Sequence, residues 1–223
     1  MHIPDGFLNI PVITGTYSIS LASLGIIKNK IKNHFSEQNI PKISLLAAFL
    51  FVAQMINIPI TGGTSTHLLG AILTLLLAGP YVAVFVMALV LTIQMLIFQD
   101  GGLTAWGANV LNLALVPVFL GYIGLKILKP FYNYLQKSSF LEPLLIFLLA
   151  WISVQASAIV CSVELALSRL APLTSILGLM ISINALTGIA EGIITVLIYE
   201  VIKSNRPDII WMLQPGFKSI LIK

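Results

Sequence analysis

Seven runs of apolar residues, separated by short polar stretches, restrict this chain to one kind of fold. A helix needs about 20 predominantly apolar residues to cross the hydrocarbon core of a bilayer. The pattern therefore predicts an all-α polytopic membrane protein, a bundle of about seven transmembrane helices. By residue number, the runs cover 9–28, 43–58, 67–79, 81–98, 106–127, 143–168 and 173–202.

The composition excludes the alternatives to a membrane protein. Of the 223 residues, 58% are hydrophobic and only 9% are charged, whereas an ordinary soluble domain is about 25% charged. Twelve basic and eight acidic side chains cannot cover the surface of a soluble domain of this length. A soluble enzyme and a nucleic-acid-binding domain are therefore excluded, although the pI is about 9.2. Disorder is excluded as well, because disordered chains are poor in apolar residues.

Lys and Arg residues predict the orientation of the bundle, because cytoplasmic loops carry the excess of basic side chains. With seven spans and an external amino terminus, eleven of the twelve basic residues fall on the cytoplasmic side, as does the carboxyl terminus. We expect one transmembrane domain over residues 1–206 and a cytoplasmic or interfacial tail over residues 207–223, in a multi-pass protein of the cell membrane. The eleven basic residues are Lys28, Lys30, Lys32, Lys42, Lys126, Lys129, Lys137, Lys203, Arg206, Lys218 and Lys223.

Three short segments share the outer side in this topology, and they bring two of the three histidines together. The segments are residues 1–6, 59–67 and 99–102, which contain His2 and His67. The first segment lacks the positive charge that precedes the apolar region of a secretory signal, so we expect it to be retained.

His2 follows the amino terminus directly, which creates a chelator for a transition metal. The Met1 amine, the deprotonated His2 amide nitrogen and His2 Nδ1 can bind one ion through a five-membered and a six-membered ring. Loss of the amide proton requires a strongly polarising ion, and square-planar nitrogen sites suit Ni(II) and Cu(II). His67 can supply the fourth ligand. Alternatively, a histidine stands at position 2 by chance, and His67 is a structural residue of a re-entrant loop.

Polar residues on either side of the histidines have two interpretations each. The hydroxyls of Thr64, Ser65 and Thr66 can orient the imidazole that follows them, as ligating histidines usually require. Asp5 and Asp100 are each followed by glycine, so they either form turns or attract the cation and close over it.

Three further polar residues fall inside the apolar runs. Asn109, Glu164 and Glu191 either form hydrogen bonds between helices or shape an inner cavity. Intramembrane carboxylates usually face the interior of a bundle. We therefore expect all three side chains to point inward, and Asn109 is a candidate for supporting the metal site.

Several segments of the chain resemble one known family. They are similar to the CbiM/NikM family, the substrate-binding membrane components (S components) of cobalt and nickel energy-coupling-factor transporters. The resemblance covers nearly the whole chain. The segments that carry it are Met1–Leu8, Pro59–Gly70, Gln99–Leu103, Gly107–Asn109 and Ala190–Gly192.

This resemblance implies both a metal site and partners. It implies an amino terminus tucked into the bundle, where Met1 and His2 give three nitrogens and His67 gives the fourth. The transported ligand is Co²⁺ or Ni²⁺, and no cofactor is implied. The implied partners are a transmembrane coupling (T) protein, cytoplasmic ATPase subunits and a small accessory membrane protein.

Two other functions stay open at the level of the sequence. The chain lacks the P-loop signature G-x-x-x-x-G-K-[ST], so ATP hydrolysis by this chain is not expected and it is not expected to be an enzyme. A stand-alone secondary permease for divalent metals remains the main alternative. An intramembrane metalloenzyme is less consistent with the sequence, because no general base is evident near the two histidines. Cobalt and nickel are not distinguished.

Overall fold

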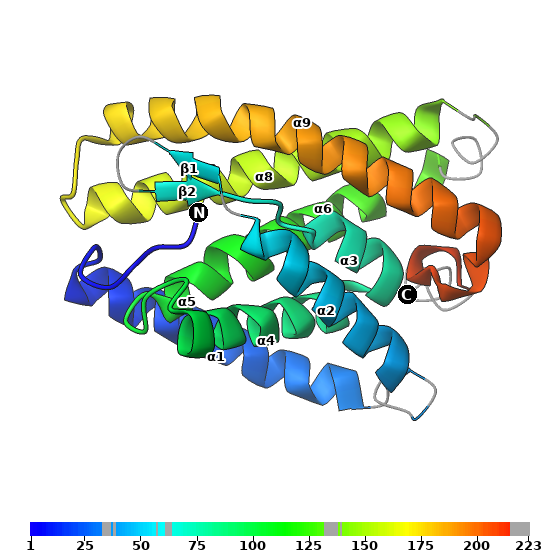
Figure 1. Ribbon diagram of the computed structural model, residues 1–223, viewed down its shortest axis with the longest axis horizontal. Coiled ribbons are helices and arrows are strands. Elements are labelled where there is room, and N and C mark those ends of the chain that lie inside the picture. The colour runs from blue at the N-terminus through cyan, green and yellow to red at the C-terminus, as the bar shows by residue number, and fades with distance from the viewer. Residues whose placement is uncertain are drawn as a thin grey trace.

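Helices joined by short connections form almost the whole molecule (Figure 1). The computed structural model describes residues 1–32, 37, 39–56, 58–60, 64–131, 138 and 140–214. Within these residues, seven helical segments match the seven predicted runs, so the predicted all-α fold is confirmed. In chain order, they are α1 (Ile10–Ile31), α2 (Ile40–Met55), α3 (Ala71–Ala78), α4 (Pro80–Phe98), the composite helix α5 and α6 (Trp106–Val110 and Val116–Leu128), α8 (Leu141–Leu167) and α9 (Leu173–Asn205).

Two irregular features interrupt this helical pattern. A two-stranded antiparallel hairpin, β1 (Ile58–Ile60) and β2 (Thr64–Thr66), lies between α2 and α3. A π-helical turn (Leu111–Leu115) joins α5 to α6 without breaking the helix. Turns of this type are frequently found at functional sites.

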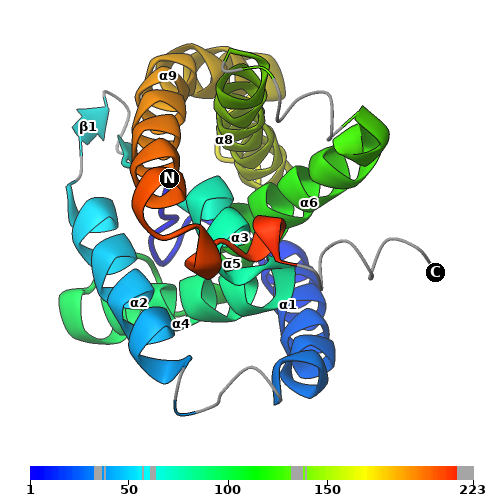
Figure 2. The same ribbon diagram turned by 90° about the vertical axis from the view of Figure 1, so that its right-hand side faces the viewer.

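The short helix α3 lies at the centre of the bundle (Figure 2). Its residues from Ala71 to Leu76 are all buried, and it contacts α4, α6, α8 and α9. The hairpin of α8 and α9 lies along one side of the molecule, while α1 and α4 lie along the other (Figure 1). The amino terminus folds back into the bundle near the β-hairpin, away from the end where the chain beyond α9 begins (Figure 1).

Helix lengths are consistent with a protein that crosses a membrane. Among the described residues, five helices are long and apolar enough to span it: α1, α4, α5 with α6, α8 and α9. Helix α2 is apolar but has 16 residues. The eight residues of α3 reach only about 12 Å. The apolar run at 67–79 is therefore not one helix, because residues 67–70 are not helical and α3 begins at Ala71.

The face of each long helix that turns away from the bundle is apolar. Ile10, Leu45 and Leu186 are each more than 70% exposed, which is suited to lipid contact. Which end of the bundle is cytoplasmic stays a prediction, and three of the basic residues behind it, Lys137, Lys218 and Lys223, lie outside the described residues.

The chain beyond α9 folds back onto the bundle. A short 3₁₀ turn (Trp211–Leu213) contacts α3, and the Trp211 indole lies against Gly79. Gly79 has a φ of +79°, and a Cβ added there would lie 2.8 Å from the indole. Residues 207–214 thus cover the turn between α3 and α4. The predicted domain boundary at residue 206 stays a prediction, and residues 215–223 lie outside the described part of the chain.

Gly107 allows α1 and α5 to approach closely. A Cβ on Gly107 would lie 2.6 Å from the backbone of Tyr17 in α1. The Ser20 hydroxyl donates a hydrogen bond to the Gly107 carbonyl at 2.7 Å, and the Tyr17 hydroxyl donates to the Leu103 carbonyl. Small residues permit such contact between membrane helices. This packing fixes the loop before α5, which carries part of the site described below.

Replacing Gly107 by alanine should push α1 away from α5. Overpacking of this kind costs about 1–3 kcal/mol, so we expect a lower midpoint in thermal unfolding of the purified protein in detergent. Gly25→Ala is the matched control, because a Cβ at that position in α1 meets nothing within 4 Å and alanine favours the helix. Equal midpoints for the two variants would contradict the close packing.

Candidate functional site

The amino-terminal segment, residues 1–9, enters the bundle ahead of α1. Met1, His2 and Ile3 are 1%, 7% and 2% exposed. Removal from water disfavours the charged form of an amine, and burial lowers the pKa of the Met1 amine to about 6. At neutral pH this amine is therefore mostly unprotonated, the form that can donate its electron pair to a metal.

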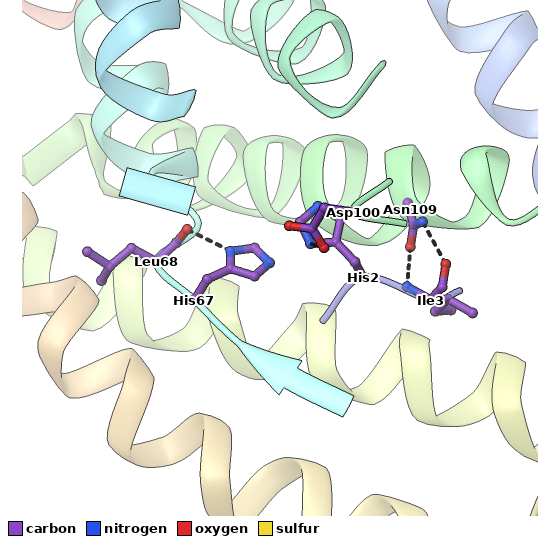
Figure 3. A network of polar contacts seen from close by, with 6 residues as sticks. All are labelled: His2, Ile3, His67, Leu68, Asp100 and Asn109. Atoms are coloured by element: carbon purple, nitrogen blue, oxygen red, sulfur yellow. Dashed lines mark hydrogen bonds and ion pairs between the residues drawn. The ribbon is translucent and has the colours of Figure 1, made fainter. Parts of the chain in front are cut away.

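Three hydrogen bonds to the backbone of Ile3 hold this segment in place. Asn109 Oδ1 accepts from the Ile3 amide at 2.8 Å, and Asn109 Nδ2 donates to the Ile3 carbonyl at 3.1 Å (Figure 3). The Gly102 amide donates to the same carbonyl at 2.9 Å. The Asn109 side chain, which was predicted to face inward, thus holds the amino-terminal backbone at Ile3, the residue that follows His2.

Asp5 ties the amino-terminal segment to the loop that precedes α5. Its carboxylate accepts hydrogen bonds from the Leu103 amide at 3.1 Å, the Thr104 amide at 2.7 Å and the Thr104 hydroxyl at 2.5 Å. The bonds from Thr104 lower the pKa of Asp5. A Cβ on Gly102 would lie 2.3 Å from the Asp5 amide nitrogen, so the two segments lie in direct contact.

His67 lies on the non-helical stretch between β2 and α3 and is 1% exposed. Its Nδ1 lies 2.9 Å from the Leu68 carbonyl oxygen. A carbonyl oxygen can only accept, so Nδ1 carries the proton and Nε2 carries the lone pair. Nε2 is buried and has no hydrogen-bond partner among the described residues. Figure 3 shows this nitrogen on the side of the ring that faces His2.

The two imidazoles lie side by side. The ring centres of His2 and His67 are 4.6 Å apart, and the ring planes differ by 26°. His2 Nδ1 lies 3.4 Å from Asp100 Oδ1. Burial, with the nearby Met1 amine, lowers the pKa of His2 to about 4, so His2 is neutral at pH 7, the state in which imidazole binds metals.

Not every residue predicted to support the site does so directly. The Thr66 hydroxyl bonds to α9, donating to Asn184 Oδ1 at 3.0 Å, while a main-chain carbonyl orients the His67 ring. The side chains of Thr64 and Ser65 lie outside the described residues. The sequence did not identify the Leu68 carbonyl, because every residue has one and no sequence pattern marks it.

The set of possible metal donors is unusual. Among the described residues, no group of three or more His, Cys, Asp or Glu side chains is placed to hold a metal ion. Two imidazoles alone make a weak site. Main-chain nitrogens are further candidate donors, and the Met1 amine interacts electrostatically with both imidazoles.

Comparisons with known proteins define the class of this molecule. A family model described as the cobalt uptake substrate-specific transmembrane region, CbiM, matches residues 2–209. The relatives described below are transport proteins and not enzymes, and the apolar helices agree with a multi-pass membrane protein. The chain therefore belongs to the CbiM family, and the resemblance predicted from the sequence is confirmed.

Individual relatives agree with this family. A putative fused nickel transport protein NikMN of Archaeoglobus fulgidus is 39% identical over 212 residues, which cover 94% of this chain and 68% of the relative. A putative metal transport protein of Haloquadratum walsbyi is 33% identical, and the match covers 95% of this chain and 94% of the relative. The crystal structure of a truncated transition metal transporter superposes with a TM-score of 0.82 at 29% identity, covering 92% of this chain and 99% of that one.

Removing the Asn109 side-chain amide should release the amino terminus. In Asn109→Ala, the Ile3 amide loses its partner, and an unpaired buried polar group costs about 1–3 kcal/mol. We expect the Met1 amine to react faster with an amine-specific reagent, followed by mass spectrometry of the amino-terminal peptide. Asn205→Ala is the control, because Asn205 is exposed and, among the described residues, its side chain donates to the Val201 carbonyl within its own helix. Equal labelling rates in the wild type and Asn109→Ala would contradict the role of this amide.

Proposed function

We propose that this chain captures Co²⁺ or Ni²⁺ with high affinity for uptake into the cell. Four nitrogens bind the ion: the Met1 amine, the deprotonated His2 amide, His2 Nδ1 and His67 Nε2. The proposal depends on one observation above all, the 4.6 Å separation between the ring centres of His2 and His67. The Met1 amine also interacts electrostatically with both imidazoles, so all four nitrogens belong to one small region.

The separation of the two rings is suited to shared ligation. With metal–nitrogen distances of about 2.0 Å, two imidazoles in neighbouring positions of a square-planar ion have ring centres about 4.4 Å apart. In this arrangement the amine and His2 Nδ1 lie opposite each other, and His67 lies opposite the amide.

The surrounding residues would exclude water and retain the amino terminus. Asp100, beside His2, attracts the cation and offsets part of its charge. The bonds of Asp5 with Leu103 and Thr104 keep the loop over the amino-terminal segment. A planar set of four nitrogens favours Ni²⁺, and the relative from Archaeoglobus fulgidus is described as a nickel transport protein, whereas the family description names cobalt.

We further propose that this chain acts as the substrate-binding component of an ECF-type ABC transporter. Its partners would be a transmembrane coupling protein, cytoplasmic ATPase subunits and a small accessory membrane protein. Two observations support this. The sequence lacks a P-loop, and the family description refers to a substrate-specific region, which implies that other subunits supply the energy.

Replacing His2 by alanine tests the metal site. The substitution removes His2 Nδ1 and with it the six-membered chelate ring. We expect the affinity for Ni²⁺ to fall at least about 100-fold, measured by calorimetry on purified protein with an unmodified amino terminus. The control is His34→Ala, which changes the third histidine of the chain and lies outside the segments 1–6 and 59–67. Full affinity in His2→Ala would refute the proposed donor set.

A reconstitution experiment distinguishes the proposed transporter from a secondary permease. The chain alone, in vesicles with an ion gradient, should bind Ni²⁺ at the site but should not accumulate it in the lumen. Sustained accumulation without ATPase subunits would instead identify a stand-alone permease.

A further inference from the structure

One face of α9 holds the segment that carries His67. Asn184, Thr187 and Glu191 are spaced i, i+3 and i+7, which places them on the same side of the helix. The Thr66 hydroxyl donates to Asn184 Oδ1 at 3.0 Å and lies 2.9 Å from the Thr187 hydroxyl. These contacts fix the residue immediately before His67.

Glu191 fixes the chain on the other side of His67. Its Oε2 accepts a hydrogen bond from the Leu69 amide at 2.9 Å, and its Oε1 accepts one from the Gly70 amide at 2.7 Å. Both amides lie at the amino-terminal end of α3, where backbone N–H groups lack helical partners. Glu191 is 2% exposed, and both of its oxygens are committed to these two bonds.

The packing around Glu191 leaves it little freedom to move. Gly188 and Gly192 flank it on α9, and a Cβ on these glycines would lie 2.9 Å from the Trp151 ring and 2.4 Å from the Phe147 ring. Helix α9 therefore lies tightly against α8 at this level. Gly70 has a φ of +71°, and a Cβ there would lie 2.2 Å from Leu50. The carboxylate and the two amides it binds are both held by rigid surroundings.

Capping a helix with a buried carboxylate costs more free energy than capping it with a neutral side chain, because the carboxylate must leave water. Intramembrane carboxylates are rare and usually functional, and a neutral side chain can satisfy the amides of a helix end. A bidentate carboxylate has a different advantage, because it fixes two consecutive peptide groups at once. These bonds hold the chain at Thr66, Leu69 and Gly70, on both sides of His67. The side-chain torsions of His67 are then the main freedom left to its ring, and the Leu68 carbonyl restrains them.

We propose that Glu191 is a positioning residue for metal capture, which sets the location of His67 Nε2 by holding Leu69 and Gly70. It does not touch the ion. This inference rests on the proposed function, since it assigns Glu191 a role only if His67 is a ligand.

Glu191→Gln tests the proposal with almost no change in shape. A glutamine offers one acceptor oxygen and turns an NH₂ group toward the second amide, so one of the two bonds is lost. We expect the affinity for Ni²⁺ to fall about 10- to 100-fold, as is typical when a residue that orients a metal ligand is changed. Glu200→Gln is the matched control, because Glu200 lies on the same helix about 14 Å away and makes no hydrogen bond to the His67 segment among the described residues. Its affinity should match that of the wild type.

A double-mutant cycle separates positioning from general damage to the fold. If Glu191 acts through His67, the Glu191→Gln change should alter Ni²⁺ affinity by less than about twofold when His67 is already alanine. The residual binding by Met1 and His2 makes this measurement possible. Equal losses in the presence and absence of His67 would overturn the proposal, as would unchanged affinity in Glu191→Gln alone.

Two further measurements keep the outcomes distinct. The absorption spectrum of bound Ni²⁺ should shift in Glu191→Gln but not in Glu200→Gln, because the fourth nitrogen is displaced.

If Glu191→Gln does not fold, Thr187→Val removes the hydroxyl on the other side of His67, and the same cycle applies. Unchanged Ni²⁺ affinity in His67→Ala would refute the proposed function itself, whereas loss in His67→Ala without loss in Glu191→Gln would refute only the role of Glu191.

Discussion

The hydrogen bonds between the Ile3 backbone, Asn109 and Gly102 are the interaction on which the site depends. An amino terminus normally lies in water, because burial of its amine is unfavourable. Here three bonds to one residue offset that cost and hold the segment inside the bundle. The same bonds bring the Met1 amine near two neutral imidazoles. Without them, the Met1 amine would be held less firmly near the two imidazoles.

The membrane imposes a second constraint on this arrangement. Non-helical backbone is tolerated at membrane depth only where the protein satisfies its polar groups. The stretch before α3 meets this condition through side chains from distant helices. Gln54 donates to the Leu69 carbonyl at 2.8 Å, and Glu191 accepts from Leu69 and Gly70. Gln54 and Glu191 therefore act as partners for a non-helical segment of the site, whereas Asn112 donates to Glu164 and joins two helices.

The sequence predicted the helices well, because long apolar runs indicate burial in lipid. The order of the predicted spans also placed His2 and His67 on the same face of the bundle. It did not predict the hydrogen-bond partner of each polar side chain. Asn109 binds a residue 106 positions away and Glu191 binds residues 121 and 122 positions away, so these pairs follow from packing and not from local pattern. Thr66 shows the same limit, since its hydroxyl bonds to α9 and not to the neighbouring imidazole.

The π-helical turn at Leu111–Leu115 has a consequence for how related chains align. A turn of this kind accommodates one extra residue while the helix on either side keeps its register. Relatives should therefore tolerate a one-residue gap within this turn and keep Asn109 in place. A gap in α6 would instead rotate the following residues by about 100°. Gly121, where a Cβ would lie 2.2 Å from Ile72, would then turn away from α3, so length differences in this helix should concentrate in the turn.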